Sequence, residues 1–385
     1  MDIINKIEIK HFRSFDGGKD QEKVRIDNIK DLNIFSGSND SGKSNVLRAL
    51  NLFFNNEITP GVKFDKDRDF SKIVANRFDK EIEQRRKKVS LATQTEKTKS
   101  IRRSDEIISI KIHFNNKQRQ RGLPEKFWIS KQFSQKNNFQ GEYIYQTNLK
   151  GNAQVTFFLK SFKFEYIPAI KDRLFFNHLF KKLQAYLFEK GDKKKENKFR
   201  QSSENFNNIL KTETDELFQK FFASTGVDAS FHIPSTLVDF FRTLSVKTEN
   251  DISLFDRGDG VQARFIPEIL EEISQNSSKN IIWGFEEPEN SYEAKNIRKL
   301  KDEFLKKYSR KKQIFITTHT KEFLSLKREL TPDELKIFNN KKITVAKQEK
   351  ELKKLNTSKT SSDISIYRVW KNKNTNNTSF VTRFD

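Results

Sequence analysis

The sequence predicts an α/β fold with a mainly parallel core sheet, an N-terminal β lobe and an inserted helical hairpin. Short apolar runs alternate with helical stripes in the last third of the chain, as in parallel strands joined by helices. Period-two alternation dominates before residue 170 and predicts antiparallel strands. Two helical stripes around a charged link lie between these regions. We therefore expect the halves of the core domain at 1–172 and 227–385, and the hairpin at 173–226.

Basic residues are in large excess over acidic ones. The 385 residues include 74 Lys and Arg against 52 Asp and Glu, which gives a net charge of +22. Such a charge favours anionic partners, nucleic acid first. A composition rich in lysine and phenylalanine is also what an AT-rich genome encodes by default. The charge alone therefore leaves specific contact with DNA open.

Several classes of protein are disfavoured by what the sequence lacks. It contains no cysteine, which excludes disulfides and thiolate metal sites. Its five histidines are scattered without metal-binding spacing, so we expect no zinc site. No apolar run is long enough to span a bilayer, and the first residues lack the pattern of a signal peptide. We expect a cytoplasmic protein without membrane contact.

One stretch fits the phosphate-loop pattern G-x-x-x-x-G-K-[ST] at every fixed position. It reads Gly37-Ser38-Asn39-Asp40-Ser41-Gly42-Lys43-Ser44, and Asn45 follows it. An apolar run at 32–35 predicts a buried strand before the loop, and helical spacing at 47–54 predicts a helix after it. This context separates a phosphate loop from a glycine-serine turn that contains a lysine by chance.

The chemistry of such a loop follows from its backbone. Successive N–H groups of the loop and of the helix N-terminus carry partial positive charge and cradle phosphate oxygens. Lys43 would neutralise the β and γ phosphates, and the Ser44 hydroxyl would ligate Mg²⁺. The sequence therefore predicts a nucleotide site at this loop.

The segments around the loop predict the β lobe. Alternation at 7–9 and 24–26 indicates antiparallel strands that enter the sheet carrying the phosphate loop. Alternation at 107–114 predicts a half-buried strand, and aromatic-rich segments around Trp128 and at 143–158 continue the lobe. The stretch from 162 to 169 predicts a strand that runs to a proline, in Tyr166-Ile167-Pro168-Ala169.

Two other regions leave alternatives open. The basic, polar stretch at 77–103 is either a solvated or disordered surface insertion or an arm that faces nucleic acid. Helical stripes at 176–187 and 206–221 predict an antiparallel hairpin, which either packs on the core or projects towards a partner. The segment at 231–241 returns the chain to the core.

Acidic residues follow an apolar strand in the last third. The strand at 281–285 ends in Glu286-Glu287-Pro288-Glu289, at the strand end where ligands bind in open α/β sheets. Glu286 would hold Mg²⁺ through water, and Glu287 would polarise an attacking water. The alternative is an acidic turn after a strand. A late edge strand is expected at 364–369.

A histidine follows the next apolar strand, at 314–316. A lone histidine is more often structural than functional. His319, however, ends a buried strand that should lie beside the carboxylate strand, where its imidazole could bond a γ-phosphate oxygen.

A glycine turn precedes a helix with apolar residues at 265, 269 and 273. Its N–H groups are open towards an anion, although glycine turns before helices are common. The turn reads Arg257-Gly258-Asp259-Gly260.

Taken in order, these motifs resemble the ABC-type ATPase heads of the SMC, RecF and OLD families. Residues 7–15 look like the first strand of these heads, 37–44 like Walker A, and 257–260 like a divergent signature. Residues 281–287 look like Walker B with the catalytic glutamate, and His319 looks like the switch histidine. Glu286 stands where the family usually carries aspartate, and the signature lacks the Leu-Ser-Gly-Gly form. The glutamine of the Q-loop is not placed.

The resemblance implies slow ATP hydrolysis with Mg²⁺. It also implies at least a homodimer, because in such heads ATP lies between the phosphate loop of one subunit and the signature of another. OLD proteins carry a TOPRIM nuclease after the switch histidine, and the residues that follow His319 are too few for one. We therefore expect a stand-alone ATPase of a bacterial anti-phage system, with a separate effector nuclease and a phage protein as trigger. The alternatives are a RecF/SMC-like ATPase that acts on DNA in repair or recombination, and a nucleotide-dependent structural module.

Overall fold

The computed structural model groups the chain into two compact units. The first comprises Met1–Ile170 and Ser278–Asp385, and the second is Lys171–Ser277. The residues that the structure describes are 3–16, 23–91, 107–116, 123–145, 149, 151–189, 252–275, 277–290, 292–324, 364–372, 378–384 and scattered positions between 201 and 219. The boundaries expected from the sequence at 172 and 226 stay predictions.

A six-stranded, mainly parallel sheet forms the core of the first unit, in the order β13-β12-β3-β11-β10-β9. Only β13 runs antiparallel, and it pairs with β12. Strands β3 and β11 are buried at every position, as expected for a sheet covered on both faces. The strands are β3 (Leu32–Ser36), β9 (Phe162–Ile167), β10 (Asn280–Glu286), β11 (Gln313–Thr318), β12 (Ile364–Asn372) and β13 (Thr378–Phe384). The predicted fold class is confirmed.

The late strand is not the edge strand that the sequence suggested. Strand β12 pairs with β3 on one side and with β13 on the other, so β13 takes the edge. The prediction was wrong because the polar residues after 372 hid a second strand, which begins at Thr378.

A separate five-stranded antiparallel sheet makes the β lobe, in the order β2-β1-β6-β7-β8. Its strands are β1 (Ile4–Lys10), β2 (Val24–Ile26), β6 (Ile107–Asn115), β7 (Lys126–Ser134) and β8 (Glu142–Tyr145). The first two strands were expected in the phosphate-loop sheet, and that prediction was wrong. Their alternation suits a sheet with one buried face, and β1 pairs with β6 through Ile7 and Ile112.

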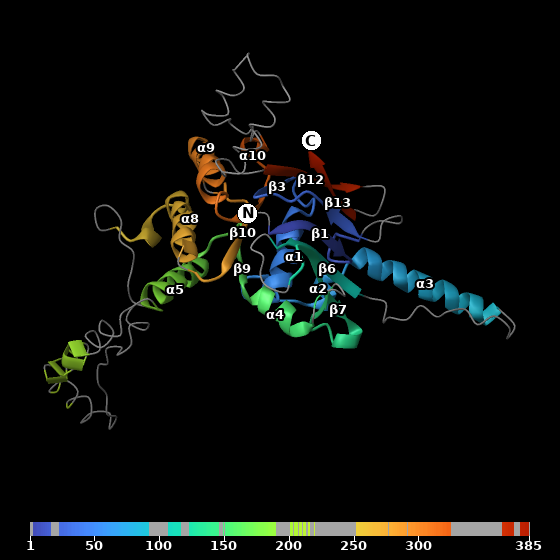
Figure 1. The fold of residues 1–385 in the computed structure, drawn as a ribbon, viewed down its shortest axis with the longest axis horizontal. Coiled ribbons are helices and arrows are strands. Elements are labelled where there is room, and N and C mark those ends of the chain that lie inside the picture. The colour runs from blue at the N-terminus through green and yellow to red at the C-terminus, as the bar shows by residue number, and fades with distance from the viewer. Residues whose placement is uncertain are drawn as a thin grey trace, which may run out of the picture. The chain divides into compact units, whose positions relative to one another are not determined.

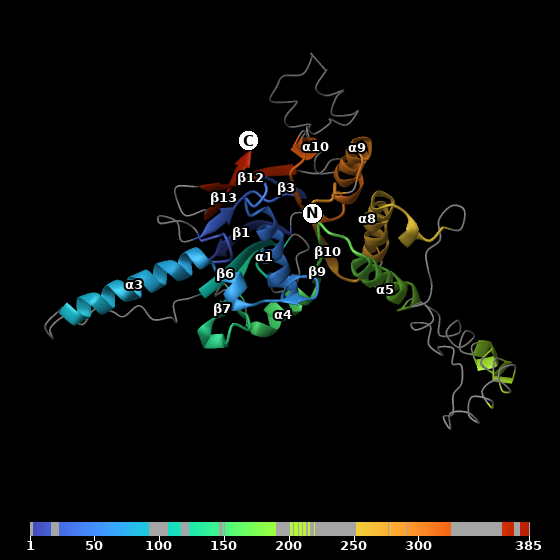
Figure 2. The same cartoon turned by 180° about the vertical axis from the view of Figure 1, so that it is seen from behind.

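Helix α1 (Lys43–Asn55) lies between the two sheets (Figures 1 and 2). It contacts β6 of the lobe and β9, β10 and β11 of the core sheet. The Phe53 ring makes an edge-to-face contact with Tyr143 of the lobe, and the Phe54 ring stacks on Phe164 of the core sheet. The helix that follows the phosphate loop is therefore the shared core element of the unit.

Short elements complete the first unit. A hairpin of β4 (Glu57–Thr59) and β5 (Val62–Lys63) turns at Gly61. The remaining elements are α2 (Lys66–Asp69), α3 (Lys72–Leu91), η2 (Gln135–Asn137), α4 (Asn152–Lys160), α9 (Ala294–Glu303), η5 (Phe304–Tyr308) and α10 (Lys321–Leu324). The basic stretch at 77–103, for which a surface insertion and an arm facing nucleic acid were the alternatives, is helical as far as Leu91, and 92–106 lie outside the described residues.

Helix α4 replaces a stretch that was expected to continue the β lobe. Val155 and Phe158 are buried three positions apart, whereas Phe157 is 72% exposed. This spacing is helical, and the aromatic content of the segment had suggested a strand instead.

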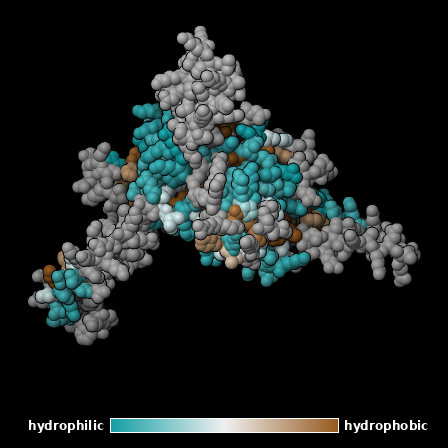
Figure 3. All heavy atoms as spheres, in the orientation of Figure 1, coloured by the Kyte–Doolittle hydropathy of each residue, from teal (hydrophilic) through white to brown (hydrophobic). Residues whose placement is uncertain are grey.

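The second unit contains α5 (Arg173–Glu189), η4 (Leu254–Asp256) and α8 (Asp259–Gln275). Helix α5 contacts α8. Most of the second predicted stripe, at 206–221, and the segment at 231–241 lie outside the described residues, so the hairpin pairing stays a prediction. No helix in the described part of the chain is long and apolar enough to cross a membrane. On the face drawn in Figure 3, most of the described residues are hydrophilic.

Candidate nucleotide site

The phosphate loop joins β3 to α1, as the sequence predicted. Gly42 stands at the N-cap of α1 with φ of 99°, and no described side chain caps the helix there. In the first turn the Asn45 N–H donates to the Gly42 carbonyl at 3.0 Å, and no described side chain accepts from the N–H groups before it, which is how helix N-termini bind anions. Asp40 is also left-handed, with φ of 60°.

Both glycines of the pattern are required by the C-terminal strands. A Cβ atom at Gly37 would collide with the backbone carbonyl of Val369 on β12. At Gly42 it would lie 2.5 Å from the Ser379 hydroxyl of β13, in addition to the strain of a positive φ. The loop therefore packs so closely against the β12–β13 hairpin that neither glycine position has room for a side chain.

Polar contacts tie this hairpin to the loop. Lys371 Nζ on β12 lies 2.6 Å from Asp40 Oδ2. Ser379 donates its hydroxyl to the Ser41 carbonyl at 2.7 Å and its backbone N–H to the Ser14 carbonyl at 2.9 Å. These contacts were not predicted, because no pattern in the sequence links positions more than 300 residues apart.

Lys43 is folded back over the loop. Its Nζ donates to the carbonyls of Gly37 and Ser38, at 3.0 Å each, and the residue is 5% exposed. Burial lowers the pKa of Lys43, while the carboxylates of Glu287, Glu289 and Glu286 act to raise it. The loop lysine therefore lies within electrostatic reach of all three glutamates.

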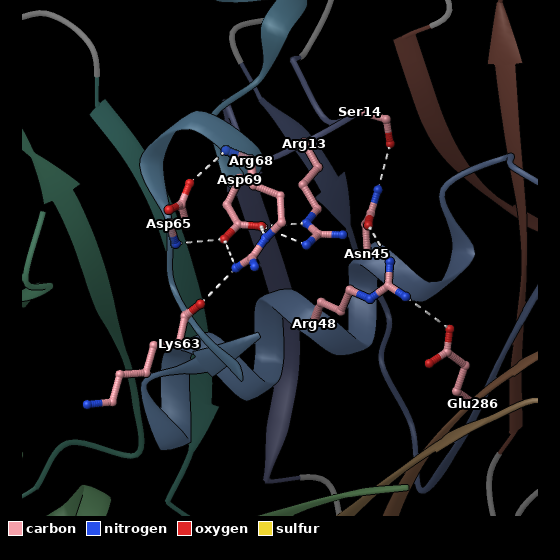
Figure 4. Close-up of polar contacts among 9 residues, drawn as sticks. All are labelled: Arg13, Ser14, Asn45, Arg48, Lys63, Asp65, Arg68, Asp69 and Glu286. Atoms are coloured by element: carbon pink, nitrogen blue, oxygen red, sulfur yellow. Dashed lines mark hydrogen bonds and ion pairs between the residues drawn. The ribbon is translucent and has the colours of Figure 1, made fainter. Parts of the chain in front are cut away.

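Glu286 ends β10 and is held by two residues that were not predicted as site residues. Tyr166 at the end of β9 donates its hydroxyl to Glu286 Oε2 at 2.5 Å. Arg48 Nη2 on α1 lies 3.5 Å from Glu286 Oε1 (Figure 4). Burial, with the Glu286 charge, raises the pKa of Tyr166, so the phenol stays a donor.

Glu287 follows in a constrained position. Its φ of 45° is left-handed, and its N–H donates to the Thr317 carbonyl of the neighbouring strand at 2.8 Å. Asn290 Nδ2 donates to Glu287 Oε2 at 3.1 Å, and His319 Nδ1 lies 3.5 Å from Oε1. The pairing of β10 with β11 thus brings together the two residues predicted as catalytic. Strained backbone of this kind is frequent at functional sites.

Glu289 is a buried carboxylate for which no role was predicted from the sequence. Its Oε1 accepts from the Thr318 hydroxyl at 2.5 Å and from the His319 N–H at 3.2 Å. Its Oε2 is buried and has no hydrogen-bond partner in the described structure. The spacing E-P-E after a buried strand was the available signal.

Two arginines around the buried carboxylate of Asp69 anchor the segment after β1 beside the loop (Figure 4). Arg13 donates to Asp69 Oδ1 from Nε at 2.9 Å and from Nη2 at 2.6 Å, and Arg68 Nη2 lies 2.8 Å from Oδ2. Burial lowers the pKa of Arg13, against the effect of Asp69. Next to it, Asn45 Nδ2 donates to the Ser14 hydroxyl at 2.9 Å.

The predicted signature lies in the second unit. Arg257 follows η4, and Gly258 precedes α8 in an exposed position. Gln262 Nε2 donates to the Arg257 carbonyl at 2.7 Å and holds this turn. Asp259 and Gly260 form the first turn of α8. A role for this turn at a subunit interface stays a prediction.

The described residues fit Mg²⁺-ATP. The Ser41 hydroxyl, the Thr317 hydroxyl and Glu289 Oε2 are buried without hydrogen-bond partners among them, which is costly unless a ligand or water completes them. Lys43 and the uncapped helix offer donors to phosphate, and the glutamates and Ser44 offer the hard oxygen ligands that Mg²⁺ prefers.

The chain has the α/β fold of ABC-type ATPase heads, with a phosphate loop between β3 and α1. A solved SMC head bound to the C-winged helix domain of ScpA has a TM-score of 0.50 and 14% identity, covering 100% of this chain and 98% of that chain. The family described as "AAA domain, putative AbiEii toxin, Type IV TA system" matches residues 32–325, and the chain belongs to this family.

Two other solved heads and one curated relative are similar. The SMC head domain from Thermotoga maritima has a TM-score of 0.45, 14% identity and coverage of 100% and 99% of the two chains. The SMC head from Pyrococcus furiosus bound to the C-terminal domain of ScpA has a TM-score of 0.46, 12% identity and coverage of 100% and 96%. "Uncharacterized protein MJECL44" of Methanocaldococcus jannaschii is 44% identical over 50 residues, and the match spans 13% of the length of either protein.

Proposed function

We propose that the chain binds and slowly hydrolyses ATP, with Glu287 as the group that polarises the attacking water. The observation that carries the proposal is the 3.5 Å approach of Glu287 Oε1 and His319 Nδ1, from adjacent parallel strands beside the phosphate-loop strand. A carboxylate next to an imidazole can accept a proton from water while the imidazole contacts the γ-phosphate.

Other residues of the site would bind the phosphates and Mg²⁺. The backbone of 37–44 and Lys43 would hold the phosphates, with Asn45 fixing the start of α1 through Ser14. Ser44 and Glu286 would hold Mg²⁺, which neutralises charge on the phosphates when it is bound. Tyr166 and Arg48 orient Glu286 for this role.

We infer that ATP lies between two copies of the chain. A second copy would present Arg257, Gly258, Asp259 and Gly260 to the γ-phosphate. The exposed position of Gly258 and the open space around it support this role. The protein is then a homodimer or a larger oligomer whose association depends on ATP.

We propose further that this ATPase is the sensor and scaffold of an anti-phage system and controls a separate TOPRIM-type nuclease. The family name, with its putative toxin and toxin–antitoxin system, supports a role in defence. The stretch Tyr166-Ile167-Pro168-Ala169 and the turn Glu287-Pro288-Glu289-Asn290-Ser291 look most like AriA, the ATPase of the PARIS system. A phage protein would be the trigger that releases the effector.

Co-purification with the products of adjacent genes, with and without ATP, tests the proposal. We expect a nuclease-type partner that is retained with ATP by the wild type and lost with Lys43→Ala. A partner retained equally by both proteins, or no partner in either condition, contradicts the scaffold role.

A RecF/SMC-like ATPase acting on DNA is the second candidate, and one surface favours it. A hollow of about 220 Å³ on the outer face of the five-stranded sheet is lined by Lys10, Lys23 and Lys111 around Trp128, and also by Glu8, whose Oε2 lies 2.6 Å from Lys23 Nζ. Lys111 Nζ lies 4.0 Å from the centroid of the Trp128 ring. Basic side chains around an aromatic ring suit a nucleic-acid strand.

A DNA-binding measurement separates the two candidates. Tight duplex binding at physiological salt, with ATP turnover that rises with DNA, would favour repair over the scaffold role. Lys111→Glu should then weaken DNA binding, with Lys295→Glu on exposed α9 as the matched control.

A further inference from the structure

We propose that Glu289 is a positioning residue that sets His319 against Glu287. The inference rests on the proposed ATPase function and adds a residue to it. Glu289 lies in the turn after β10 and accepts hydrogen bonds from Thr318, the last residue of β11, and from His319, which follows it. One side chain therefore joins the two segments that carry the catalytic pair.

The contacts are specific to one oxygen. Oε1 accepts from the Thr318 hydroxyl at 2.5 Å and from the backbone N–H of His319 at 3.2 Å. Thr318 Oγ1 in turn accepts from the Thr320 N–H at 3.1 Å. The backbone on both sides of His319 is therefore fixed from Glu289.

The imidazole is placed by this arrangement. His319 Nδ1 lies 3.5 Å from Glu287 Oε1 and 3.8 Å from Glu289 Oε1, while its side chain is 46% exposed. Because the imidazole is exposed, few packing contacts hold it. The hydrogen bonds that Glu289 accepts from Thr318 and from the His319 N–H therefore determine the position of the imidazole. Misplacement by about 1 Å is enough to slow a reaction roughly a hundredfold.

A contribution to the stability of the fold does not explain why a carboxylate is buried at position 289. The Glu289 side chain is 3% exposed, and its Oε2 is buried without a partner among the described residues. A buried polar atom without a partner destabilises the fold. The geometry points instead to a function that needs the two acceptor bonds of Oε1.

Paired substitutions test the inference. Glu289→Gln keeps an oxygen acceptor of the same shape, so we expect kcat within about threefold of the wild type; Glu289→Ala removes it, so kcat should fall about tenfold or more. kcat is measured at saturating Mg²⁺-ATP, so that a change in the Kd for ATP does not enter the comparison. Glu293→Gln and Glu293→Ala, at the exposed N-cap of α9, are the controls.

Two results overturn the positioning role. An equal loss in Glu289→Gln and Glu289→Ala would mean that the charge is needed and not the acceptor bonds. Unchanged kcat in Glu289→Ala would mean that His319 needs no such support.

If Glu289→Ala does not fold, variants of Thr318, which donates to Glu289, test the same contact. Thr318→Val removes the donor to Oε1 and should lower kcat, whereas Thr318→Ser keeps the hydroxyl and should restore it. Equal kcat in these two variants would also overturn the role.

Turnover that depends on Lys43 but is indifferent to Glu289→Ala and Thr318→Val contradicts only the positioning role. Turnover absent from the wild type, or unchanged in Lys43→Ala, contradicts the proposed ATPase function itself and the inference with it.

Discussion

Lys131 of the β lobe donates from its Nζ to the Phe53 carbonyl, 3.0 Å away in the last turn of α1. It also donates to the Leu52 carbonyl at 3.2 Å and to the side chain of Asn56, which ends the helix. Lysine near a helix C-terminus satisfies carbonyls that lack intrahelical partners. These bonds tie the helix that follows the phosphate loop to the lobe, at the end of the helix opposite that loop.

The Lys131 contact predicts a pH-dependent stability. Burial lowers the pKa of Lys131 from its usual 10.5 to about 7. The unfolded chain therefore binds more protons between pH 7 and 10, and the free energy of unfolding should rise with pH across this window. Denaturant unfolding of Lys131→Met should show a flatter profile, and exposed Lys126→Met should keep the wild-type slope. Identical slopes in all three proteins would contradict the shift.

His11 predicts a second pH dependence, in acid. Burial lowers its pKa to about 4 from 6.5, and its Nδ1 lies 3.0 Å from the Ile107 carbonyl. Stability that depends on neutral His11 is complete above pH 6.5 and is lost as the pH falls towards 4, by about 3 kcal/mol. His11→Asn keeps a donor and tolerates the left-handed φ of 57°. Its unfolding should lack this component, and an unchanged acid profile would contradict the prediction.

Lys43→Ala should abolish ATP binding. The substitution removes the buried ammonium that faces the loop carbonyls and leaves the fold of α1 intact. Calorimetric titration with Mg²⁺-ATP measures the loss, and Lys295→Ala on exposed α9 is the control. Wild-type affinity in Lys43→Ala would remove the loop from the nucleotide site.

Glu287→Gln should separate binding from hydrolysis. The amide keeps the bond from Asn290 but cannot take a proton from water, so turnover should fall about a hundredfold or more with ATP still bound. The ATP-associated oligomer should accumulate, which light scattering after chromatography detects. Unchanged hydrolysis would contradict the assignment of the base.

Ser379→Ala should weaken ATP binding without touching the nucleotide. It removes the bond to the Ser41 carbonyl, a loss of about 1 kcal/mol or roughly fivefold in Kd if that bond shapes the loop. Thr382→Ala, exposed on the same strand, is the matched control. Equal affinity in both variants would show that β13 does not shape the loop.

Patterns of neighbouring residues predicted the site where the chemistry is local. The phosphate loop, the carboxylate strand and the histidine strand each carry their signal within about ten residues, and β10 and β11 pair as expected. The position of Tyr166 beside Glu286 could also have been predicted, because the carboxyl ends of parallel strands meet at one edge of the sheet. Arg48 gave no such signal.

Long-range contacts escaped prediction for a physical reason. The edge position of β13 and the bonds of Lys371 and Ser379 depend on which distant strand pairs with which, and pairing is decided by packing of the whole sheet. Helix α4 was missed because aromatic residues suit strands as well as helices. The separation of the two sheets likewise followed from pairing that alternation alone does not specify.

The support that β12 and β13 give the phosphate loop has a consequence for synthesis. Residues 36–44 leave the ribosome early, whereas Val369, Lys371 and Ser379 are made more than 300 residues later. Until β12 and β13 are made, the loop lacks the two strands that Gly37 and Gly42 pack against. A nascent chain should therefore gain affinity for ATP abruptly, once β13 has emerged from the ribosome, and not gradually during translation.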